Sequence, residues 1–380
     1  MNINSIKKID YYLGYFLIVA FSPINLFFSK LIDVMPARFF KKKLIFFKLV
    51  GGGSLVIAAP SIYSIRKKYK NHKFVLYCSE SVKPFAEKLG IFDEILCIRM
   101  RRADIFILTI LGSMRRIFMA EIFINLEMHS KLSALFCLWS FSKKRVGFYS
   151  AYNQLQTNLV NFPIYRSERN PLYESYRNLC DLLEAPRLKF STFQNFFNRF
   201  NNPNAVKKIP IKNQILIAPY CSDIYPEREL NVNQIKEIVL KNYDLAKYTF
   251  ILLGSPKDLS RSIFLEKSLS ITGANICNMV GKTSFEEVIF FLRSSRELLT
   301  IDSGILFIAR LIGIKTLSFW GPSDPETRLE GPLENDTIFY KKISCSPCVH
   351  TLDTSPCSGN NLCIKQHFGS IPKNILWKIK

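Results

Sequence analysis

The sequence is short of acidic residues, and this shortage indicates the chemistry of its partners. Its 380 residues contain 30 Asp and Glu against 52 Lys and Arg, which gives a formal net charge of +22. Such a charge favours an anionic partner: nucleic acid, phospholipid headgroups or a phosphorylated glycolipid. Zinc-finger, RNP-type and helix-turn-helix signatures are absent, and the aromatic residues fall in apolar runs rather than in basic stripes. The sequence therefore favours a membrane surface and predicts no nucleic-acid partner.

Three common signatures of nucleotide and metal binding are also absent. The turn Gly51-Gly52-Gly53 follows an apolar run, but the Gly-x-Gly-x-x-Gly spacing fails at Val56 and no acidic residue ends the next strand. This excludes a nicotinamide enzyme. The segment Gly281-Lys282-Thr283 lacks the leading glycine of a Walker A loop. No Asp-x-Asp pair is present, which agrees with a reaction that needs no metal cofactor.

The hydrophobic content is high enough for folded domains. Hydrophobic residues make up 48% of the chain, including 32 Phe, and charged residues only 22%, which excludes a largely disordered protein. A chain of this length is expected to form two domains. Six of the 10 cysteines are scattered through apolar segments, as buried thiols of a cytoplasmic protein would be: Cys78, Cys97, Cys137, Cys180, Cys221 and Cys277.

Strand-like and helix-like segments alternate along the chain, which predicts α/β domains with parallel sheets. A stretch rich in Asn, Pro and Lys, 198–210, is expected to link two such domains. The expected strands are 44–50, 72–78, 93–98, 121–126 and 145–148 before this linker, and 214–218, 249–253, 297–301 and 315–320 after it. The predicted parts are an N-terminal segment (1–42), a first domain (43–200), a second domain (201–344) and a C-terminal tail (345–380).

The N-terminal segment is apolar from Tyr11 to Phe28 and has lysines on both sides. Its length is at the lower limit for crossing a bilayer, and Ser22, Pro23 and Asn25 interrupt it. No small-residue cleavage site follows, which argues against a signal peptide. We expect a peripheral or monotopic helix that lies in the membrane interface, or alternatively a helix that packs on the protein's own core.

Two polar turns in the second domain are the most informative feature of the chain. Each follows an apolar strand: Asp302-Ser303-Gly304 after the first, and Gly321-Pro322-Ser323 after the second. Backbone N–H groups at a helix start are unpaired and carry partial positive charge, so the helix that begins near Ser303 suits a phosphate. Ligands of α/β folds sit at the carboxyl edge of the sheet. The pair of turns therefore predicts an anion-binding site, although either turn alone would be read as an ordinary turn.

With these turns the chain resembles glycosyltransferase family 9, the ADP-heptose:lipopolysaccharide heptosyltransferase family. That family carries an Asp-(Ser/Thr)-Gly-x-x-His-x-Ala turn and then a Phe-Gly-Pro-(Ser/Thr)-x-Pro turn, and the likeness runs from about Lys43 to about Cys363. The resemblance implies a GT-B-like α/β fold in which two doubly wound, Rossmann-like domains face a cleft. It also implies transfer of heptose or a similar sugar from an ADP-heptose-like donor to a lipopolysaccharide-core or related glycolipid. The reaction would take place at the cytoplasmic face of the bacterial inner membrane.

The resemblance places the general base in the first domain. Residues 53–60 align with the family's Gly-Asp-(Val/Ile)-Leu segment, whose Asp is the proposed base, but Ser54 stands at that position. A serine can orient an acceptor hydroxyl but cannot take up its proton near neutral pH. We therefore expect Glu127, after the fourth strand, to be the base, with His129 second. Alternatively Glu127 caps the next helix, or the chain has lost transfer activity and only binds glycolipid or a membrane surface.

Four further residues are predicted to bind the acceptor. Gly52 and Gly53 would border it at the glycine turn. Arg101 and Arg102 could grip its phosphates, because a guanidinium offers a fork of donors. A solvated charged face is the alternative for these arginines.

The resemblance also predicts the donor-binding residues of the second domain. They would contact the diphosphate, hold the ribose or border the nucleotide: Ser222, Arg228, Asp258, Lys282, Thr283, Asp302, Ser303 and Gly304. Asp258 could instead be a helix cap. One departure removes a donor to the diphosphate, because the family's His five residues after the Asp is Phe307 here. We therefore expect a different donor sugar or a different donor affinity.

Four cysteines gather in the C-terminal tail: Cys345, Cys348, Cys357 and Cys363. Four thiolates can hold one zinc ion, and Cys-x-x-Cys is a common half-site. The second pair is spaced more widely than usual. A structural zinc, two close thiol or disulfide pairs, and an iron–sulfur cluster are the three hypotheses. No cofactor is expected to be required for catalysis.

Overall fold

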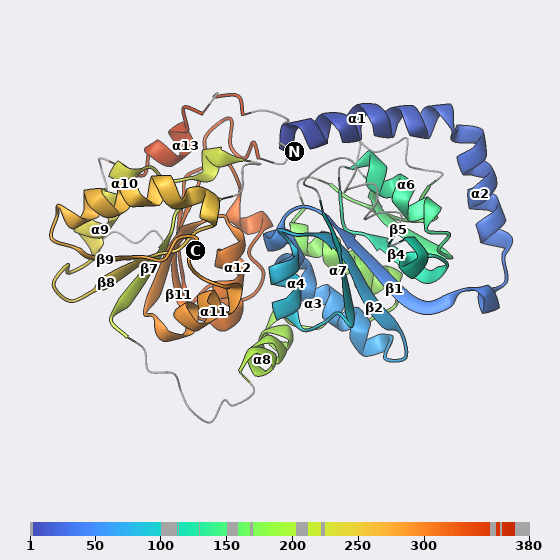
Figure 1. The fold of residues 1–380 in the computed structure, drawn as a ribbon, viewed down its shortest axis with the longest axis horizontal. Coiled ribbons are helices and arrows are strands. Elements are labelled where there is room, and N and C mark those ends of the chain that lie inside the picture. Colours follow the sequence, from blue (N-terminus) through green and yellow to red (C-terminus); the bar gives the residue numbers. More distant parts are fainter. Residues whose placement is uncertain are drawn as a thin grey trace. The chain divides into compact units, whose positions relative to one another are not determined.

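A computed structural model of the chain describes residues 3–99, 112, 114–128, 130–149, 159–167, 170–202, 212–221, 225–349, 355–357 and 359–368. The chain divides into two compact units, Met1–Phe193 and Gln194–Lys380. Each unit contains one six-stranded parallel sheet flanked by helices (Figure 1). The predicted α/β class with parallel sheets is therefore confirmed.

The sheet of the first unit has the strand order β3-β2-β1-β4-β5-β6. Its strands are β1 (Lys41–Lys48), β2 (Lys73–Ser79), β3 (Glu94–Ile98), β4 (Ala120–Asn125), β5 (Lys144–Tyr149) and β6 (Phe162–Tyr165). Phe46 in β1 pairs with Leu76 of β2 and Ile124 of β4, and all three side chains are completely buried, as expected when both faces of a sheet are covered. The sequence does not predict β6, because its four residues include Pro163, which weakens the strand signal.

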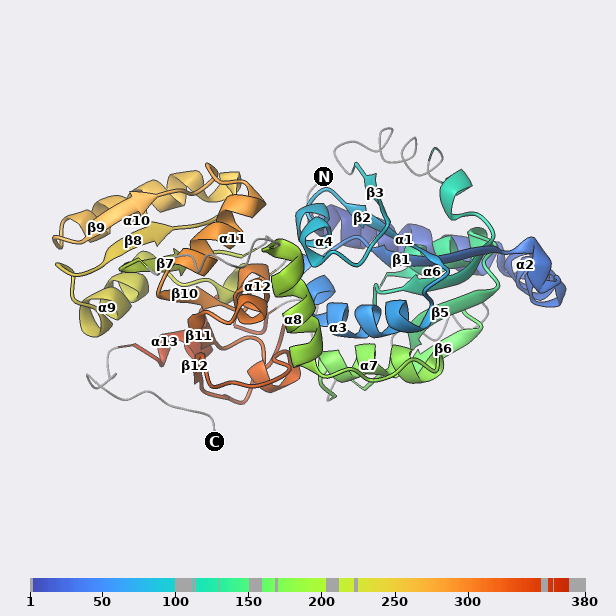
Figure 2. The same ribbon diagram turned by 90° about the horizontal axis from the view of Figure 1, so that it is seen from below.

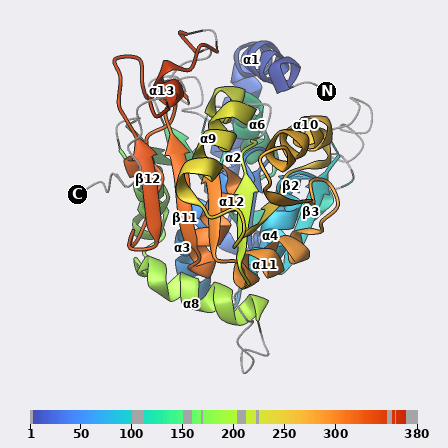
Figure 3. The same cartoon turned by 90° about the vertical axis from the view of Figure 1, so that its left-hand side faces the viewer.

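The sheet of the second unit repeats this order, as β9-β8-β7-β10-β11-β12, with β12 at one edge (Figure 3). Its strands are β7 (Gln214–Ala218), β8 (Thr249–Leu252), β9 (Asn275–Asn278), β10 (Glu297–Ile301), β11 (Lys315–Trp320) and β12 (Asp336–Tyr340). The sequence misses β9 and β12, which both begin with polar residues. They are the two edge strands, where a buried-type apolar run is not required.

Helices connect the strands in both units. In the first unit α3 packs beside α7, and α1 packs beside α6 (Figure 2). The first unit has α1 (Ile3–Ala20), α2 (Ser22–Val34), η1 (Ala37–Phe39), α3 (Gly52–Lys68), α4 (Lys83–Leu89), α6 (Lys131–Trp139) and α7 (Leu172–Leu182), and α8 (Phe190–Asn201) crosses to the second unit. The second unit has η3 (Pro226–Arg228), α9 (Val232–Asn242), η4 (Pro256–Asp258), α10 (Leu259–Ser270), α11 (Phe285–Ser294), α12 (Gly304–Ile312), η5 (Pro325–Thr327) and α13 (Leu362–Lys365).

The N-terminal helices dock on the first unit through a narrow face that is partly polar. Asn25, Ser29 and Ile32 of α2 are buried. The fully buried Arg145 of β5 donates from Nη2 to Ser29 Oγ (2.8 Å) and to Asp33 Oδ1 (3.2 Å). One face of the N-terminal segment therefore packs on the body of the first unit, as expected from the hypothesis of a helix that packs on the protein's own core.

The opposite face of these helices exposes large apolar side chains. The exposed residues of this face are Tyr11, Tyr12, Leu13, Tyr15, Phe16, Val19, Phe21, Ile24, Phe27, Leu31 and Val34. Among the described residues, no single helix is long and apolar enough to cross a bilayer. Residues Asp10–Ala20 and Ser22–Val34 reach that length and composition only together, with a bend of 74° between them.

The buried arginine that holds α2 gives a test of this packing. Replacing Arg145 by Met removes a buried guanidinium, whose partner Asp33 is exposed, and leaves the carbonyl groups of Ser142 and Leu159 without their donor. We expect the first unit to lose at least about 2 kcal/mol of unfolding free energy, measured by urea titration, because each buried acceptor left without a donor costs about 1–3 kcal/mol. The control is Arg187→Met, because this exposed arginine also pairs with carboxylates but should cost no more than about 1 kcal/mol. Equal losses of unfolding free energy in the two variants would contradict the packing of α2 around a buried Arg145.

Candidate functional site

The strand order of each sheet determines where a ligand can enter. In the first unit the chain leaves β1 toward β2 and leaves β4 toward β5, so the connections after these neighbouring strands diverge. In the second unit the same reversal occurs between β7 and β10. A crevice forms outside the carboxyl ends of the strands at such a point, and ligands of doubly wound folds bind there. The glycine turn and Glu127 lie at the first reversal, and Asp302-Ser303-Gly304 lies at the second.

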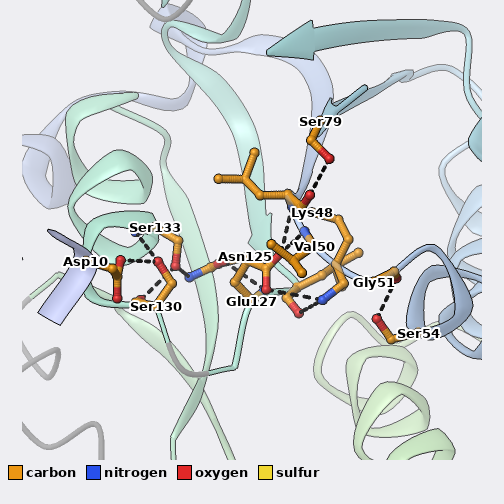
Figure 4. Close-up of polar contacts among 12 residues, drawn as sticks. Asp10, Lys48, Val50, Gly51, Ser54, Ser79, Asn125, Glu127, Ser130 and Ser133 are labelled. Atoms are coloured by element: carbon orange, nitrogen blue, oxygen red, sulfur yellow. Dashed lines mark hydrogen bonds and ion pairs between the residues drawn. The ribbon is translucent and has the colours of Figure 1, made fainter. Parts of the chain in front are cut away.

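Glu127 ties the end of β4 to the end of β1 (Figure 4). Its Oε1 accepts hydrogen bonds from the backbone N–H groups of Leu49 (2.6 Å) and Val50 (2.8 Å). Its Oε2 lies 3.2 Å from Lys48 Nζ, and the two side chains are 13% and 7% exposed. A carboxylate offers about four acceptor sites, so these three donors leave about one for a further donor. Glu127 is therefore held rigidly at the glycine turn.

The alternative role predicted for Glu127, as cap of the next helix, is wrong. The residue that caps α6 is Ser130, whose Oγ accepts from the N–H group of Ser133 at 3.1 Å. The Glu127 carboxylate points back to β1 instead. His129, the second candidate base, lies outside the described residues.

Ser54 sits in the first turn of α3 and closes the glycine turn. Its hydroxyl donates to the carbonyl oxygen of Gly51 at 2.8 Å (Figure 4). Gly51 has a φ of 86°, in the left-handed region that favours glycine. The Ser54 oxygen keeps its lone pairs for another donor, so it can orient a hydroxyl group. Of the other predicted acceptor residues, Gly52 and Gly53 begin α3 beside it, while Arg101 and Arg102 lie outside the described residues.

In the second unit, Asp302, Ser303 and Gly304 form the start of α12. Ser303 has extended backbone and its side chain does not cap the helix. The N–H groups of Gly304 and Ile305 are those that an α-helix leaves without intrahelical partners. Thr300 Oγ1 donates to the Ala218 carbonyl oxygen at 2.8 Å, which fixes β10 against the end of β7. The helix start therefore presents polarised N–H groups at the strand-order reversal.

Arg228 supplies a cation beside this helix start. Its Nη1 donates to the Asp302 carbonyl oxygen at 2.6 Å and lies 3.5 Å from Asp302 Oδ2. Burial favours a lower pKa for the Arg228 guanidinium, but the negative charge of Asp302 beside it outweighs burial and raises the pKa. Oδ2 of Asp302 is buried and accepts no hydrogen bond from any described residue. Arg228 and Asp302 thus form a buried ion pair in which Asp302 Oδ2 can still accept a hydrogen bond from a ligand.

The alternative role predicted for Asp258, as cap of the helix that follows it, is wrong, because its side chain makes no capping hydrogen bond to α10. Asp258 instead completes the capping box of η4, whose N-cap is Ser255. Its Oδ2 accepts from the N–H (3.0 Å) and Oγ (2.7 Å) of Ser255, and its Oδ1 pairs with Arg261. Arg261 also pairs with Glu229 and stacks on the ring of Tyr220, 4.6 Å from its centroid. Burial raises the pKa of Tyr220 to about 12. This network braces the loop after β7, and ribose binding by Asp258 stays a prediction.

The remaining donor residues occupy different surroundings. Lys282 Nζ donates to the Asn278 carbonyl oxygen at 3.0 Å, and Thr283 beside it is half-buried. After them, Ser284 and Glu287 exchange hydrogen bonds as a capping box at the start of α11. Ser222 lies outside the described residues, and Phe307 is buried on α12. Phe307 therefore gives no hydrogen-bond donor to a diphosphate.

The cysteines of the tail pack against the second sheet. Cys363 and Ile364 belong to the core of the second unit, and the N–H group of Cys348 donates to the Pro322 carbonyl oxygen at 3.0 Å. Burial, together with the neighbouring Cys348, raises the pKa of the Cys363 thiol to about 11. Within the described ranges, no group of three or more His, Cys, Asp or Glu could hold a metal ion. A structural zinc held by Cys345, Cys348, Cys357 and Cys363 stays a prediction.

Two residues of these sites were missed by sequence reasoning. Lys48 directly follows the buried apolar run 44–47 of β1, and a charge at the buried end of such a run is a signal for a buried ion pair. Arg261 gives no comparable signal, because it lies on a partly exposed helix among other charged residues.

Comparison with known proteins identifies the type of fold and a family. The sequence profile of glycosyltransferase family 9 (heptosyltransferase) matches residues 120–358. A search of curated proteins found no match.

Several solved structures share the fold. The family 9 glycosyltransferase of Veillonella parvula is 15% identical, with a TM-score of 0.60 over 79% of this chain and 86% of that chain. The E. coli ADP-heptose lipopolysaccharide heptosyltransferase II is 14% identical, with a TM-score of 0.58 over 80% and 91%. The E. coli heptosyltransferase WaaC with ADP-2-deoxy-2-fluoro heptose is 13% identical, with a TM-score of 0.60 over 79% and 93%. The predicted GT-B-like class of two parallel-sheet domains is confirmed.

The glycine turn gives a test of the first site's packing. A Cβ at Gly52 would lie 2.3 Å from the ring of Phe85, so Gly52→Ala forces the ring or the turn to move. We expect thermal unfolding to report a loss of about 1–3 kcal/mol, partly recovered in Gly52→Ala combined with Phe85→Ala. Gly112→Ala is the control, since nothing lies within 4 Å of its Cβ position. An unchanged stability of Gly52→Ala would show that the turn is not packed as described.

Proposed function

The chain belongs to glycosyltransferase family 9, and from this membership we propose that it transfers a sugar from a nucleotide-diphosphate sugar to a glycolipid. The donor is ADP-heptose or a close analogue, and the acceptor is a lipopolysaccharide core or a related glycolipid at the cytoplasmic face of the inner membrane. The observation that carries the proposal is the start of α12 at the strand-order reversal of the second sheet, with Arg228 beside it.

The donor's diphosphate would bind at this helix start. Polarised N–H groups and a guanidinium both stabilise negative charge, and this charge grows as the sugar leaves. Lys282, in the turn after β9, would supply a second cation. The reaction then needs no divalent metal at the diphosphate, in keeping with the lack of an Asp-x-Asp pair. Two of the similar solved structures support an adenine nucleotide donor, because WaaC is described with ADP and with an ADP-heptose analogue.

The acceptor hydroxyl would be activated at the first site. Glu127 would take the hydroxyl proton while the acceptor oxygen forms its bond to the anomeric carbon, and the bond from that carbon to the diphosphate oxygen would break. Ser54 would orient the hydroxyl. The remaining acceptor site on the Glu127 carboxylate and its position beside the glycine turn support this role.

Association with the membrane would bring the enzyme to its acceptor. The exposed aromatic and aliphatic side chains of α1 and α2, with the exposed Lys30, Arg38, Lys41 and Lys42, fit an interfacial helix pair on anionic lipid. A family member that has lost activity and only binds glycolipid or the membrane surface is the second candidate. Ser54 and Phe307, at positions where the family has Asp and His, favour it.

Transfer assays with matched carboxylate variants separate the two candidates. With ADP-heptose and a solubilised glycolipid acceptor, Glu127→Gln should lower kcat by at least about 100-fold, since a general base contributes that much or more. Glu121→Gln is the control, because Glu121 lies at the opposite end of β4 and pairs with His72. Wild-type protein that binds the donor without turnover would favour the binding protein. Full activity in Glu127→Gln would refute the role of this residue.

Vesicle sedimentation tests the membrane surface. Replacing Tyr12, Phe16 and Phe27 together by Ser should lower binding to anionic vesicles by at least about 10-fold, because each aromatic ring loses apolar burial. The control replaces Phe264 and Ile271, which are also more than half exposed but lie on the second unit. Unchanged binding of the triple variant would contradict the interfacial role of α1 and α2.

A further inference from the structure

The carboxylate of Asp10 makes a set of contacts that the proposed reaction does not use. From α1, it accepts three hydrogen bonds at the start of α6: from Ser130 Oγ (2.6 Å) and from the backbone N–H groups of Lys131 (2.9 Å) and Leu132 (3.0 Å). These N–H groups belong to the first turn of α6, where a helix leaves donors unpaired. A negative charge is favourable there. Asp10 therefore completes the end of a helix that is 120 residues away in the sequence.

Two further contacts show that α1 is fitted to this helix end. Gly14 lies one turn after Asp10, and a Cβ there would fall 2.7 Å from Lys131 Cβ, so the two backbones approach more closely than a larger residue would permit. The ammonium group of Lys131 lies 4.4 Å from the centroid of the Tyr11 ring. The contact between α1 and α6 is thus specific rather than a general apolar packing.

Hydrogen bonds continue from this point to Glu127 (Figure 4). Ser133 donates from its N–H to Ser130 Oγ and from its hydroxyl to the Ser130 carbonyl oxygen (2.8 Å). Asn125 Nδ2 donates to Ser133 Oγ at 2.9 Å, and the Glu127 N–H donates to Asn125 Oδ1 at 3.1 Å. Asn125 and Ser133 are buried. The connection from β4 to α6, which carries Glu127, is therefore held at both ends.

We propose that Asp10 is a positioning residue through which α1 holds the Glu127 connection in its working geometry. The inference rests on the proposed function, in which Glu127 is the base and α1 lies against the membrane. The helix that meets the lipid then also sets the first turn of α6, and through Ser130, Ser133 and Asn125 it fixes the carboxylate. Loss of Asp10 frees this turn without touching the reacting groups. A small displacement of a base is enough to slow a reaction strongly.

Hydrogen–deuterium exchange on the full chain tests the positioning directly. In Asp10→Ala the amides of Lys131 and Leu132 should exchange about 10-fold faster, the factor expected for a lost helix cap. Asp10→Asn keeps an acceptor oxygen and should recover part of the protection. The control is Asp33→Asn, because Asp33 anchors the same N-terminal segment but contacts Arg145 and Asn161 rather than α6. Unchanged exchange in Asp10→Ala, or an equal effect of Asp33→Asn, would overturn the proposal.

Transfer assays add a functional readout. Asp10→Ala should lower kcat by about 10-fold or more while the donor KM stays within twofold, since a displaced base affects the chemical step and not donor binding. Asp10→Asn should lie between Asp10→Ala and the wild type, and binding to anionic vesicles should be the same in all three. Equal loss of kcat and vesicle binding would mean that Asp10 only holds the membrane helix, and would overturn the positioning role. If the wild type shows no transfer, the proposed function fails, while the exchange experiment still decides whether Asp10 holds the connection.

Discussion

The reversal of strand order in each parallel sheet is the constraint on which the rest of the structure depends. Neighbouring strands whose connections leave in opposite directions open a crevice at their carboxyl ends. In the first unit this places the glycine turn after β1 beside Glu127 after β4, and in the second it places the loop after β7 beside Asp302-Ser303-Gly304. The two sheets share one strand order, so the same rule positions both sites.

At the first site, a carboxylate reaches the glycine turn from the neighbouring strand. Family 9 proteins carry an aspartate within this turn, whereas this chain has Ser54 there. The Glu127 carboxylate accepts from the N–H groups of Leu49 and Val50, so a negative charge is present at the turn all the same. The buried Lys48 beside it balances that charge. Asp10 then links the position of Glu127 to α1, the helix whose apolar side chains are exposed on the surface of the first unit.

The sequence was sufficient to predict the strand–helix alternation and the turns at the strand ends, because apolar runs and glycines mark them. The edge strands β6, β9 and β12 were missed, since an edge strand needs no continuous apolar run. Glu127 was predicted at the sheet edge, but its bonds to the backbone of Leu49 and Val50 were not, because backbone donors have no sequence signal. The contact of Asp10 with α6 could not be predicted, since it joins residues far apart in the chain and requires the close approach at Gly14.

The central claim is that the start of α12 and Arg228 receive the diphosphate of a sugar nucleotide. A crystal structure of the protein with an ADP-sugar bound tests it most directly. The account predicts diphosphate oxygens within hydrogen-bonding distance of the N–H groups of Gly304 and Ile305, with the Arg228 guanidinium beside them. A diphosphate bound elsewhere, or a helix start that stays empty at saturating nucleotide sugar, would contradict it.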